Sequence, residues 1–139
     1  MEHDKLAFNP ERVRNNIAAL KSLKSSNPSS ELLKQYSGWG GLKEAVYTPK
    51  IYKELKSCLS DQEINSIKET MKSAYFTPPE LVEIMIDLAS LLIPAPRRIL
   101  EPSAGHGVFI EQLQRKYSHE SEIIAVEKDA ISCNLLQHL

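Results

Sequence analysis

Apolar residues recur at the spacing of amphipathic helices through the first half of the chain. After Asn9-Pro10, a favoured N-cap followed by a favoured first helical residue, this pattern predicts a helix that ends near Lys24. Residues 25–30 form a polar, serine-rich linker. Further helices are expected over 31–36, from Thr48-Pro49 to about Leu59, and after Ser60, where Glu63 completes a capping box. The first half is therefore predicted to be helical.

The next helix is predicted to begin at the sequence Thr77-Pro78-Pro79-Glu80. Thr77 is expected to cap it, with both prolines in its first turn and Glu80 placed favourably for the helix dipole. Pro94 and Pro96 should end it after about Leu92. Its expected buried face consists of Leu81, Val82, Met85, Ile86 and Ala89.

Two short apolar runs then predict strands, over 98–101 and over 122–126. A helix is expected over 108–117 between them, followed by a polar loop over 118–121. Asp129 should cap a last helix over 130–139. A strand, a helix and a second strand in this order predict an α/β fold with two parallel strands.

Composition places the chain among ordinary globular proteins. It has 139 residues, 42% hydrophobic and 25% charged, with a net charge of −1. Residues 1–76 carry 12 basic and 9 acidic side chains and residues 77–139 carry 5 and 9, so their net charges are +3 and −4. A global polycation is excluded. The weakly basic first half is compatible with nucleic-acid binding, and a solvated helical surface is the alternative interpretation.

The cysteine, histidine and hydropathy patterns bear on disulfide formation, metal binding and cellular location. Cys58 and Cys133 are far apart and lack metal-ligand spacing, which favours reduced thiols. No histidine pair has ligand spacing, so no metal site is predicted. There is no apolar run of about 18 residues and no signal peptide at the N-terminus, so we expect a cytoplasmic protein.

The first candidate ligand-binding residue is Glu101, at the end of the first predicted strand. The turn Pro102-Ser103-Ala104-Gly105-His106-Gly107 follows and leads into a helix. Glycines there would allow backbone to approach a ligand, and a helix N-terminus offers N–H groups. Glu127 ends the second strand 20 residues after Gly107, at the distance where an acidic residue binds ribose hydroxyls in dinucleotide-binding folds.

Two other residues have open interpretations. Trp39, in the sequence Ser37-Gly38-Trp39-Gly40-Gly41, is interpreted as a plug between helices, and a loop that touches DNA or a cofactor pocket is the alternative. His106 is interpreted as packing against ligand or backbone rather than as a base, because no sequence neighbour would orient it.

Three segments together carry a family resemblance. AYFTPPELV, ILEPSAGHGVF and IIAVEKD resemble successive motifs of class I S-adenosylmethionine-dependent methyltransferases, most closely the N6-adenine DNA methyltransferases of restriction–modification type. The resemblance covers residues 73–134. Together with the helix patterns that predict a helical region over 1–72, it implies that residues 73–139 form the first part of a Rossmann-like cofactor-binding domain with two parallel strands. GWGGL followed by AYFTP also resembles the lead-in of methylase–helicase proteins of mobile elements.

The resemblance implies S-adenosylmethionine as cofactor and DNA as partner of the complete enzyme. Tyr75 and Thr77 would lie at the methionine end, with Thr77 near the carboxylate, Glu127 would bind the ribose hydroxyls, and Lys128 would flank the adenine. The implied cofactor-binding residues are Tyr75, Thr77, Glu101, Pro102, Ser103, Ala104, Gly105, Gly107, Glu127 and Lys128.

The sequence departs from the family in its catalytic motif. No Asn/Asp-Pro-Pro-aromatic sequence follows Glu127, so no catalytic residue is assigned, and neither the motif that contacts the cofactor's adenine ring nor a target-recognition region is found. Ile99 and Leu100 would also lie on a strand with a bare edge. We therefore expect the front piece of a longer protein, a truncated copy, or one half of a split enzyme whose complementary chain carries the remaining strands.

Two other functions fit the same residues. The cofactor motifs would equally serve the front part of an RNA or protein methyltransferase. A non-enzymatic module that binds DNA or a partner through its helical half is the third hypothesis, motivated by the +3 charge and by Trp39.

Overall fold

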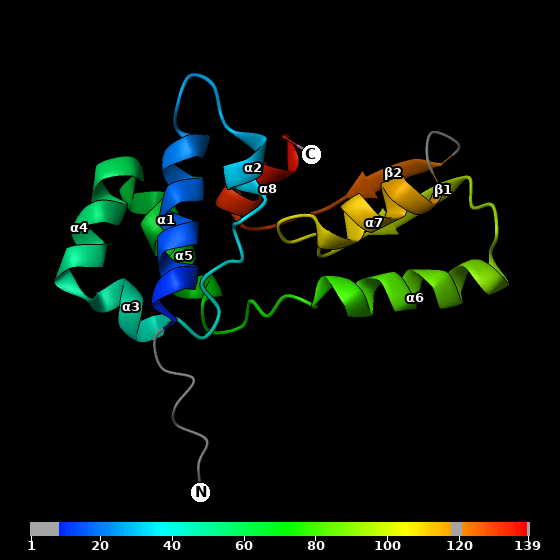
Figure 1. Ribbon diagram of the computed structural model, residues 1–139, viewed down its shortest axis with the longest axis horizontal. Coiled ribbons are helices and arrows are strands. Elements are labelled where there is room, and N and C mark those ends of the chain that lie inside the picture. Colours follow the sequence, from blue (N-terminus) through cyan, green and yellow to red (C-terminus); the bar gives the residue numbers. More distant parts are fainter. Residues whose placement is uncertain (1–8, 118–120, 139) are drawn as a thin grey trace, which may run out of the picture.

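A computed structural model of the chain describes residues 9–117 and 121–138. Its helices and strands follow the predicted order closely (Figure 1). The elements are α1 (Pro10–Leu23), α2 (Ser30–Leu33), α3 (Lys43–Tyr47), α4 (Pro49–Cys58), α5 (Asp61–Thr70), α6 (Pro79–Leu92), β1 (Arg98–Glu101), α7 (Val108–Tyr117), β2 (Glu122–Ala125) and α8 (Ala130–Leu136). The short helix α3 was not predicted, and most of the predicted loop 118–121 lies outside the described residues.

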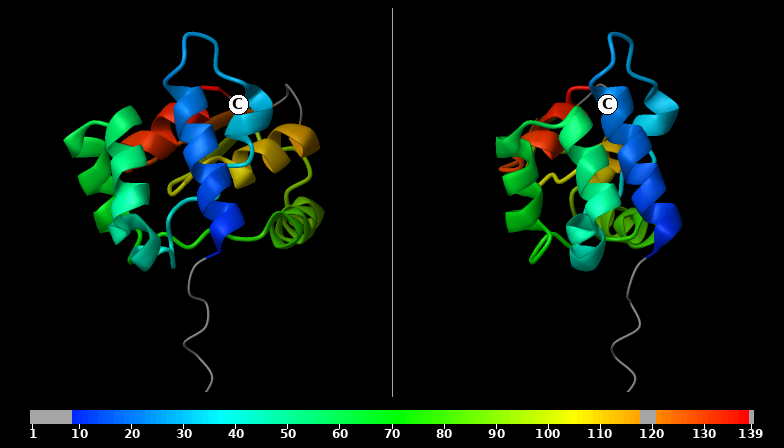
Figure 2. Two further views of the ribbon diagram at one scale, coloured as in Figure 1. Left: turned by 60° about the vertical axis from the view of Figure 1, so that its left-hand side comes forward. Right: turned by 90° about the vertical axis from the view of Figure 1, so that its left-hand side faces the viewer.

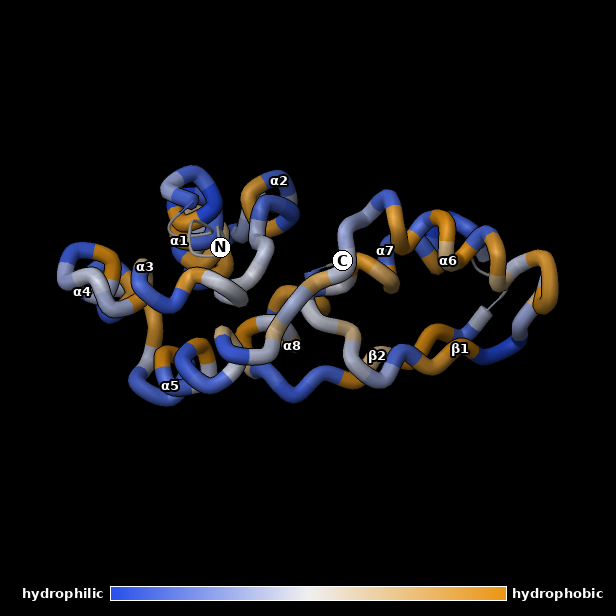
Figure 3. The backbone as a smooth tube through the Cα atoms, turned by 90° about the horizontal axis from the view of Figure 1, so that it is seen from below, coloured by the Kyte–Doolittle hydropathy of each residue, from blue (hydrophilic) through white to orange (hydrophobic). Residues whose placement is uncertain are grey.

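The described strands β1 and β2 form a parallel pair, in which Ile99 lies opposite Ile123 and Leu100 opposite Ile124. Helices α6 and α7 lie together on one side of this pair (Figure 3). Val82, Ile86 and Leu113 form a small core there, and Ile99 and Ile123 pack against it. The described chain is thus α/β, mostly helical with one small parallel sheet, as predicted.

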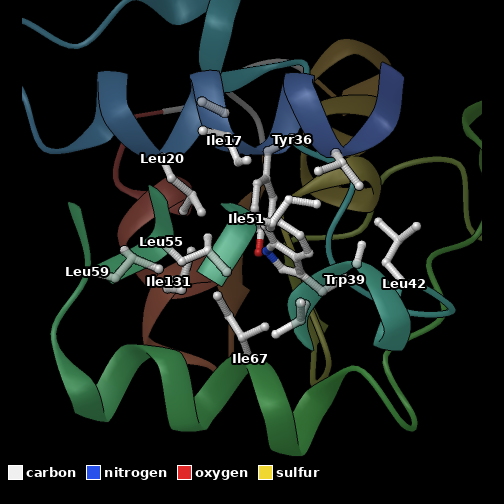
Figure 4. Close-up of a cluster of buried hydrophobic side chains, with 14 of the residues drawn as sticks. Ile17, Leu20, Tyr36, Trp39, Leu42, Ile51, Leu55, Leu59, Ile67 and Ile131 are labelled. Atoms are coloured by element: carbon white, nitrogen blue, oxygen red, sulfur yellow. The ribbon is translucent and has the colours of Figure 1, made fainter. Parts of the chain in front are cut away.

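The main core lies among the helices rather than at the sheet. Side chains from α1 to α5 converge on it, and Trp39 is only 2% exposed at its centre (Figure 4). The buried position of Trp39 confirms its interpretation as a plug between helices. Its indole nitrogen faces the Tyr36 hydroxyl in Figure 4 and has no hydrogen-bond partner among the described residues.

The last helix, α8, belongs to this same core. Ile131 and Leu135 are buried among residues of α1, α4 and α5, so the chain returns to the helical region after β2 (Figure 2). The Asp129 carboxylate also accepts a hydrogen bond from the Ser66 hydroxyl of α5 at 2.5 Å. Packing therefore continues across the predicted boundary at residue 73.

Most predicted helix starts are confirmed by their caps. The side chain of Asn9 accepts from the backbone N–H of Arg12, and that of Asp129 accepts from Ser132 N–H. Ser60 and Glu63 form the predicted capping box, with reciprocal side chain to backbone hydrogen bonds. Local sequence was sufficient at these positions because a cap involves only residues of one turn.

The predicted start of α6 is wrong by one residue. Pro78, not Thr77, is the N-cap, and no side chain caps this helix. The reason is steric: Pro79 disfavours helical backbone angles in the residue before it, and Pro78 has an extended ψ of 141°. Pro79 therefore becomes the first helical residue, and Thr77 lies outside the helix.

The predicted buried face of α6 is confirmed only at Val82 and Ile86. Leu81 and Met85 are 48% and 46% exposed, and Ala89 is exposed as well. The sheet has two strands in the described chain, so α6 has little to pack against. Large exposed apolar side chains on and near it are Leu81, Ile84, Met85, Leu88, Leu91, Leu92, Ile93 and, on β1, Leu100. In the described parts of the chain, however, no helix combines the length and apolar character needed to cross a membrane.

Candidate functional site

The glycine turn lies at the carboxyl ends of the two strands, where backbone hydrogen bonds hold it. The N–H of Val126 donates to the carbonyl of Glu101 at 2.9 Å, and the N–H of Ala104 donates to the carbonyl of Val126 at 3.0 Å. The turn after β1 thus folds over the end of β2. The carboxyl ends of parallel strands are where ligands bind in open α/β sheets.

Both predicted acidic residues hold this turn through their carboxylates. Glu127 Oε2 accepts the N–H of Gly105 at 2.6 Å, and its Oε1 accepts the N–H of Asp129 at 2.7 Å. Glu101 accepts the N–H of Ser103 at 2.9 Å. The structure therefore brings Glu127 to the turn that contains Gly105, 22 residues earlier in the sequence. A carboxylate has about four lone-pair positions, so Glu127 can accept further hydrogen bonds.

Position 105 must be glycine, because the ring of Phe76 occupies the space that a side chain on Gly105 would need. The φ of Gly105 is +57°, and a Cβ placed on it would lie 2.7 Å from Cε1 of the Phe76 ring. On the other side of the ring, a Cβ on Gly38 would lie 2.0 Å from Cε2. The ring is thus inserted between two glycine turns. Sequence reasoning missed Phe76, although its position between Tyr75 and Thr77 in the AYFTP motif could have drawn attention to it.

His106 packs edge-on against aromatic rings. Its ring centroid lies 4.3 Å from that of Phe76 and 6.2 Å from that of Tyr36. Burial, and secondarily the charge of Arg12, lowers the pKa of His106 to about 4, so the imidazole is neutral at pH 7. Its Nδ1 is buried without a hydrogen-bond partner among the described residues.

Two polar side chains of α1 fix the other glycine turn. Arg12 donates to the carbonyls of Ser37, Gly38 and Gly40, at 2.9 to 3.0 Å, and to the Ser37 hydroxyl at 3.0 Å. The fully buried Asn16 donates to the Gly38 carbonyl at 2.6 Å and accepts the Ser37 N–H at 2.9 Å. Neither residue was predicted to be important, since such contacts join positions more than 20 residues apart.

A pocket of about 430 Å³ lies between the helical region and the AYFTPP segment. Thr77, His106 and the highly exposed Tyr75 line it from one side, and Arg12 and Lys34 line it from the helical region. Its other lining residues are Gln35, Tyr36, Ser37, Gly40, Ala74, Phe76, Pro78, Pro79 and Val108.

The predicted site residues therefore form two groups. Tyr75 and Thr77 line the pocket, whereas Glu101, Glu127 and Lys128 are not among its lining residues. Ala104, Gly105 and Gly107 are buried within the turn. Pro102, Ser103 and Lys128 are exposed beside it. His106 belongs to the turn and also lines the pocket, so it connects the two groups.

The chain was compared with protein-family models, curated proteins and solved structures, and none of them matches it.

Proposed function

We propose that this chain is the S-adenosylmethionine-binding front part of a DNA adenine-N6 methyltransferase, with a Rossmann-like arrangement around β1 and β2. The observation that carries the proposal is the hydrogen bond between Glu127 at the end of β2 and Gly105 in the turn after β1. It joins an acidic side chain to a glycine turn at the carboxyl ends of two parallel strands, which is where ligands bind in open α/β sheets. The three motifs that resemble this family supply its chemical identity.

In the proposed complex, the cofactor extends from Glu127 to Thr77. Glu127 accepts hydrogen bonds from the ribose hydroxyls with the lone pairs that Gly105 and Asp129 leave free. Exposed Lys128 flanks the adenine ring. Tyr75 and Thr77 contact the methionine end from the pocket.

Methyl transfer would need groups that these 139 residues do not contain. The only Pro-Pro pair follows Thr77, not Asn or Asp. In the complete enzyme, the target adenine is extruded from the duplex because its amino group is otherwise out of reach. The amino nitrogen attacks the methyl carbon, and the sulfonium leaves as a neutral thioether. Catalysis is then mainly positioning, and we propose that the chain does not methylate DNA alone.

A complementary chain that carries the remaining strands is the proposed partner. This part of the proposal is supported by the exposed apolar side chains on α6 and by Leu100, which is 62% exposed on β1. A neighbouring reading frame that encodes an Asn/Asp-Pro-Pro-aromatic motif would identify the partner. Mixed with it, the chain should methylate adenine in duplex DNA, and Leu88→Lys should reduce that activity. If no such frame exists near the gene, the split-enzyme proposal loses its support.

Calorimetric titration with S-adenosylmethionine tests cofactor binding. Because the remaining strands are missing, we expect weak but saturable binding by the wild-type chain. Glu127→Ala should bind at least about tenfold more weakly, because a charged acceptor is lost. Glu122→Ala is the matched control: this exposed glutamate lies at the other end of β2 and pairs with Arg98. Absence of binding by the wild-type chain, or equal weakening by both variants, would contradict the proposal.

A DNA-binding module without enzymatic function is the second candidate. It is favoured by a groove of about 440 Å³ between α1 and α4, where Arg14, Lys21 and Lys50 line an apolar floor. Only Lys21 of these three forms an ion pair, with Glu54, among the described residues. The wild-type chain should retard duplex DNA in electrophoresis at low salt. The double variant Arg14→Ala, Lys50→Ala should not. No shift at low salt excludes this function, since phosphate-driven binding is strongest there.

A further inference from the structure

The pocket between α1 and the AYFTPP segment is positively charged. Arg12 and Lys34 line it, and none of its lining residues is acidic. The ammonium group of Lys34 lies 3.6 Å from a carboxylate oxygen of Glu111, so its charge is partly balanced. Arg12 is the remaining cation of this pocket.

Arg12 has hydrogen bonds but no ionic partner among the described residues. Its four hydrogen bonds all go to neutral oxygens, three backbone carbonyls and one hydroxyl. None of the ion pairs found in residues 9–117 and 121–138 includes it. Burial lowers the pKa of the guanidinium, but an arginine keeps its charge at neutral pH.

Such an arginine attracts an anion. A guanidinium carries five N–H groups, and the four hydrogen bonds of Arg12 leave one N–H available. Its carbonyl contacts fix the orientation of the planar group in advance, which reduces the entropy lost when a ligand binds. A carboxylate oxygen can accept this N–H in a charge-assisted hydrogen bond.

We propose that Arg12 binds the carboxylate of the amino-acid part of S-adenosylmethionine, in the pocket that it shares with Thr77. This inference rests on the proposed function and adds a residue from the helical region to the cofactor site. It also gives the helical region a role in binding: α1 would contact the cofactor directly rather than only support the fold.

The competing explanation is that Arg12 only holds the turn 37–40. The two roles differ in their ligand dependence. A residue that binds the carboxylate affects only ligands that carry one, whereas a residue that holds the turn affects all ligands of the pocket equally. S-adenosylmethionine and its decarboxylated counterpart differ only in this group and are therefore the appropriate pair.

The experiment is calorimetric titration of both ligands into the wild-type chain and three variants. We expect the wild-type chain to prefer S-adenosylmethionine by about tenfold or more. Arg12→Gln should remove this preference, and Arg12→Lys, which keeps the charge, should retain part of it. Asn16→Ala is the control, since it removes three other hydrogen bonds to the same turn. The Asn16→Ala variant should weaken the binding of both ligands by the same factor.

The outcomes separate this inference from the proposed function. If the wild-type chain binds both ligands equally, or if Arg12→Gln weakens both equally, Arg12 does not bind the carboxylate while the proposed cofactor site stands. If neither ligand binds the wild-type chain, both proposals are overturned. Should Arg12→Gln fail to fold, the salt dependence of the wild-type chain still tests the inference. The preference of the wild-type chain must shrink between 50 and 500 mM salt, because screening weakens charge pairs, and an unchanged preference contradicts the inference.

Discussion

At the scale of single residues, one aromatic ring connects the two glycine turns. Phe76 lies between Gly38 and Gly105, and its ring makes a T-shaped contact with that of His106. The ring leaves no space for a side chain at either glycine. Arg12 and Asn16 of α1 hold the turn at Gly38, and Glu127 holds the turn at Gly105. Because Phe76 contacts both turns, it links α1 to the end of β1.

Gly105→Ala should destabilise the chain by about 3 kcal/mol, from backbone strain at positive φ plus overlap with the Phe76 ring. Gly41→Ala is the matched control, because Gly41 has a φ of +74° but no atom within 4 Å of an added Cβ. It should cost only about 1 kcal/mol. Urea denaturation measures both values. Equal costs would show that the ring moves aside freely.

His106 should make stability depend on pH. Its pKa falls from 6.5 to about 4 on folding, because burial disfavours the charged form. Below pH 6.5 the unfolded chain therefore takes up this proton before the folded chain does, and stability decreases towards pH 4. The expected loss between pH 7.5 and pH 5 is about 2 kcal/mol.

The comparison of wild type with His106→Gln isolates this effect. Urea midpoints at pH 7.5 and pH 5 give the change in unfolding free energy for each chain. The wild-type decrease should exceed that of His106→Gln by about 2 kcal/mol. The same pH dependence in both chains would mean that His106 is not the responsible group.

At the scale of elements, the caps of α1, α5 and α8 were predicted correctly, and the cap of α6, which begins at consecutive prolines, was not. The capped helix α2 was predicted over 31–36 but spans Ser30–Leu33. The cap of α1 depends on Asn9 and one N–H of its own first turn. The start of α6 is set by the ring of Pro79 acting on Pro78. Thr77 is consequently free to face the pocket.

Thr77→Ala should change the unfolding free energy by less than about 0.5 kcal/mol, because Thr77 caps no helix. Asn9→Ala, which removes a real cap, should cost about 1 kcal/mol. Thermal denaturation followed by circular dichroism checks both variants. A loss at Thr77 as large as that at Asn9 would indicate a capping role after all.

At the scale of the whole molecule, α8 ties the sheet to the helical core. Ile131 is fully buried among residues of the first half of the chain. Asp129, at the start of α8, is bonded both to Ser66 and, through its N–H, to Glu127. The candidate site is therefore supported by residues from both ends of the chain.

Ile131→Ala should destabilise the chain by about 2–5 kcal/mol, since it leaves a cavity in the main core. Ile84→Ala is the matched control, because Ile84 is 56% exposed on α6, and it should cost less than about 0.5 kcal/mol. Urea denaturation of the two variants compares them directly. A small effect at Ile131 would show that the helical core folds without α8.

The sequence by itself determined the order of the elements other than α3, three of the four predicted helix caps, the parallel strands and the acidic residues at their ends. Each of these depends on periodicity or on contacts within one turn. Only the tertiary structure decided that Phe76 fills the space between Gly38 and Gly105, that Arg12 lines the pocket of Thr77, and that α8 joins the helical core. It also decided that α6 buries Val82 and Ile86 but not Leu81 or Met85. These features depend on packing between distant segments, and the spacing of apolar residues gives the face of a helix without specifying what covers it.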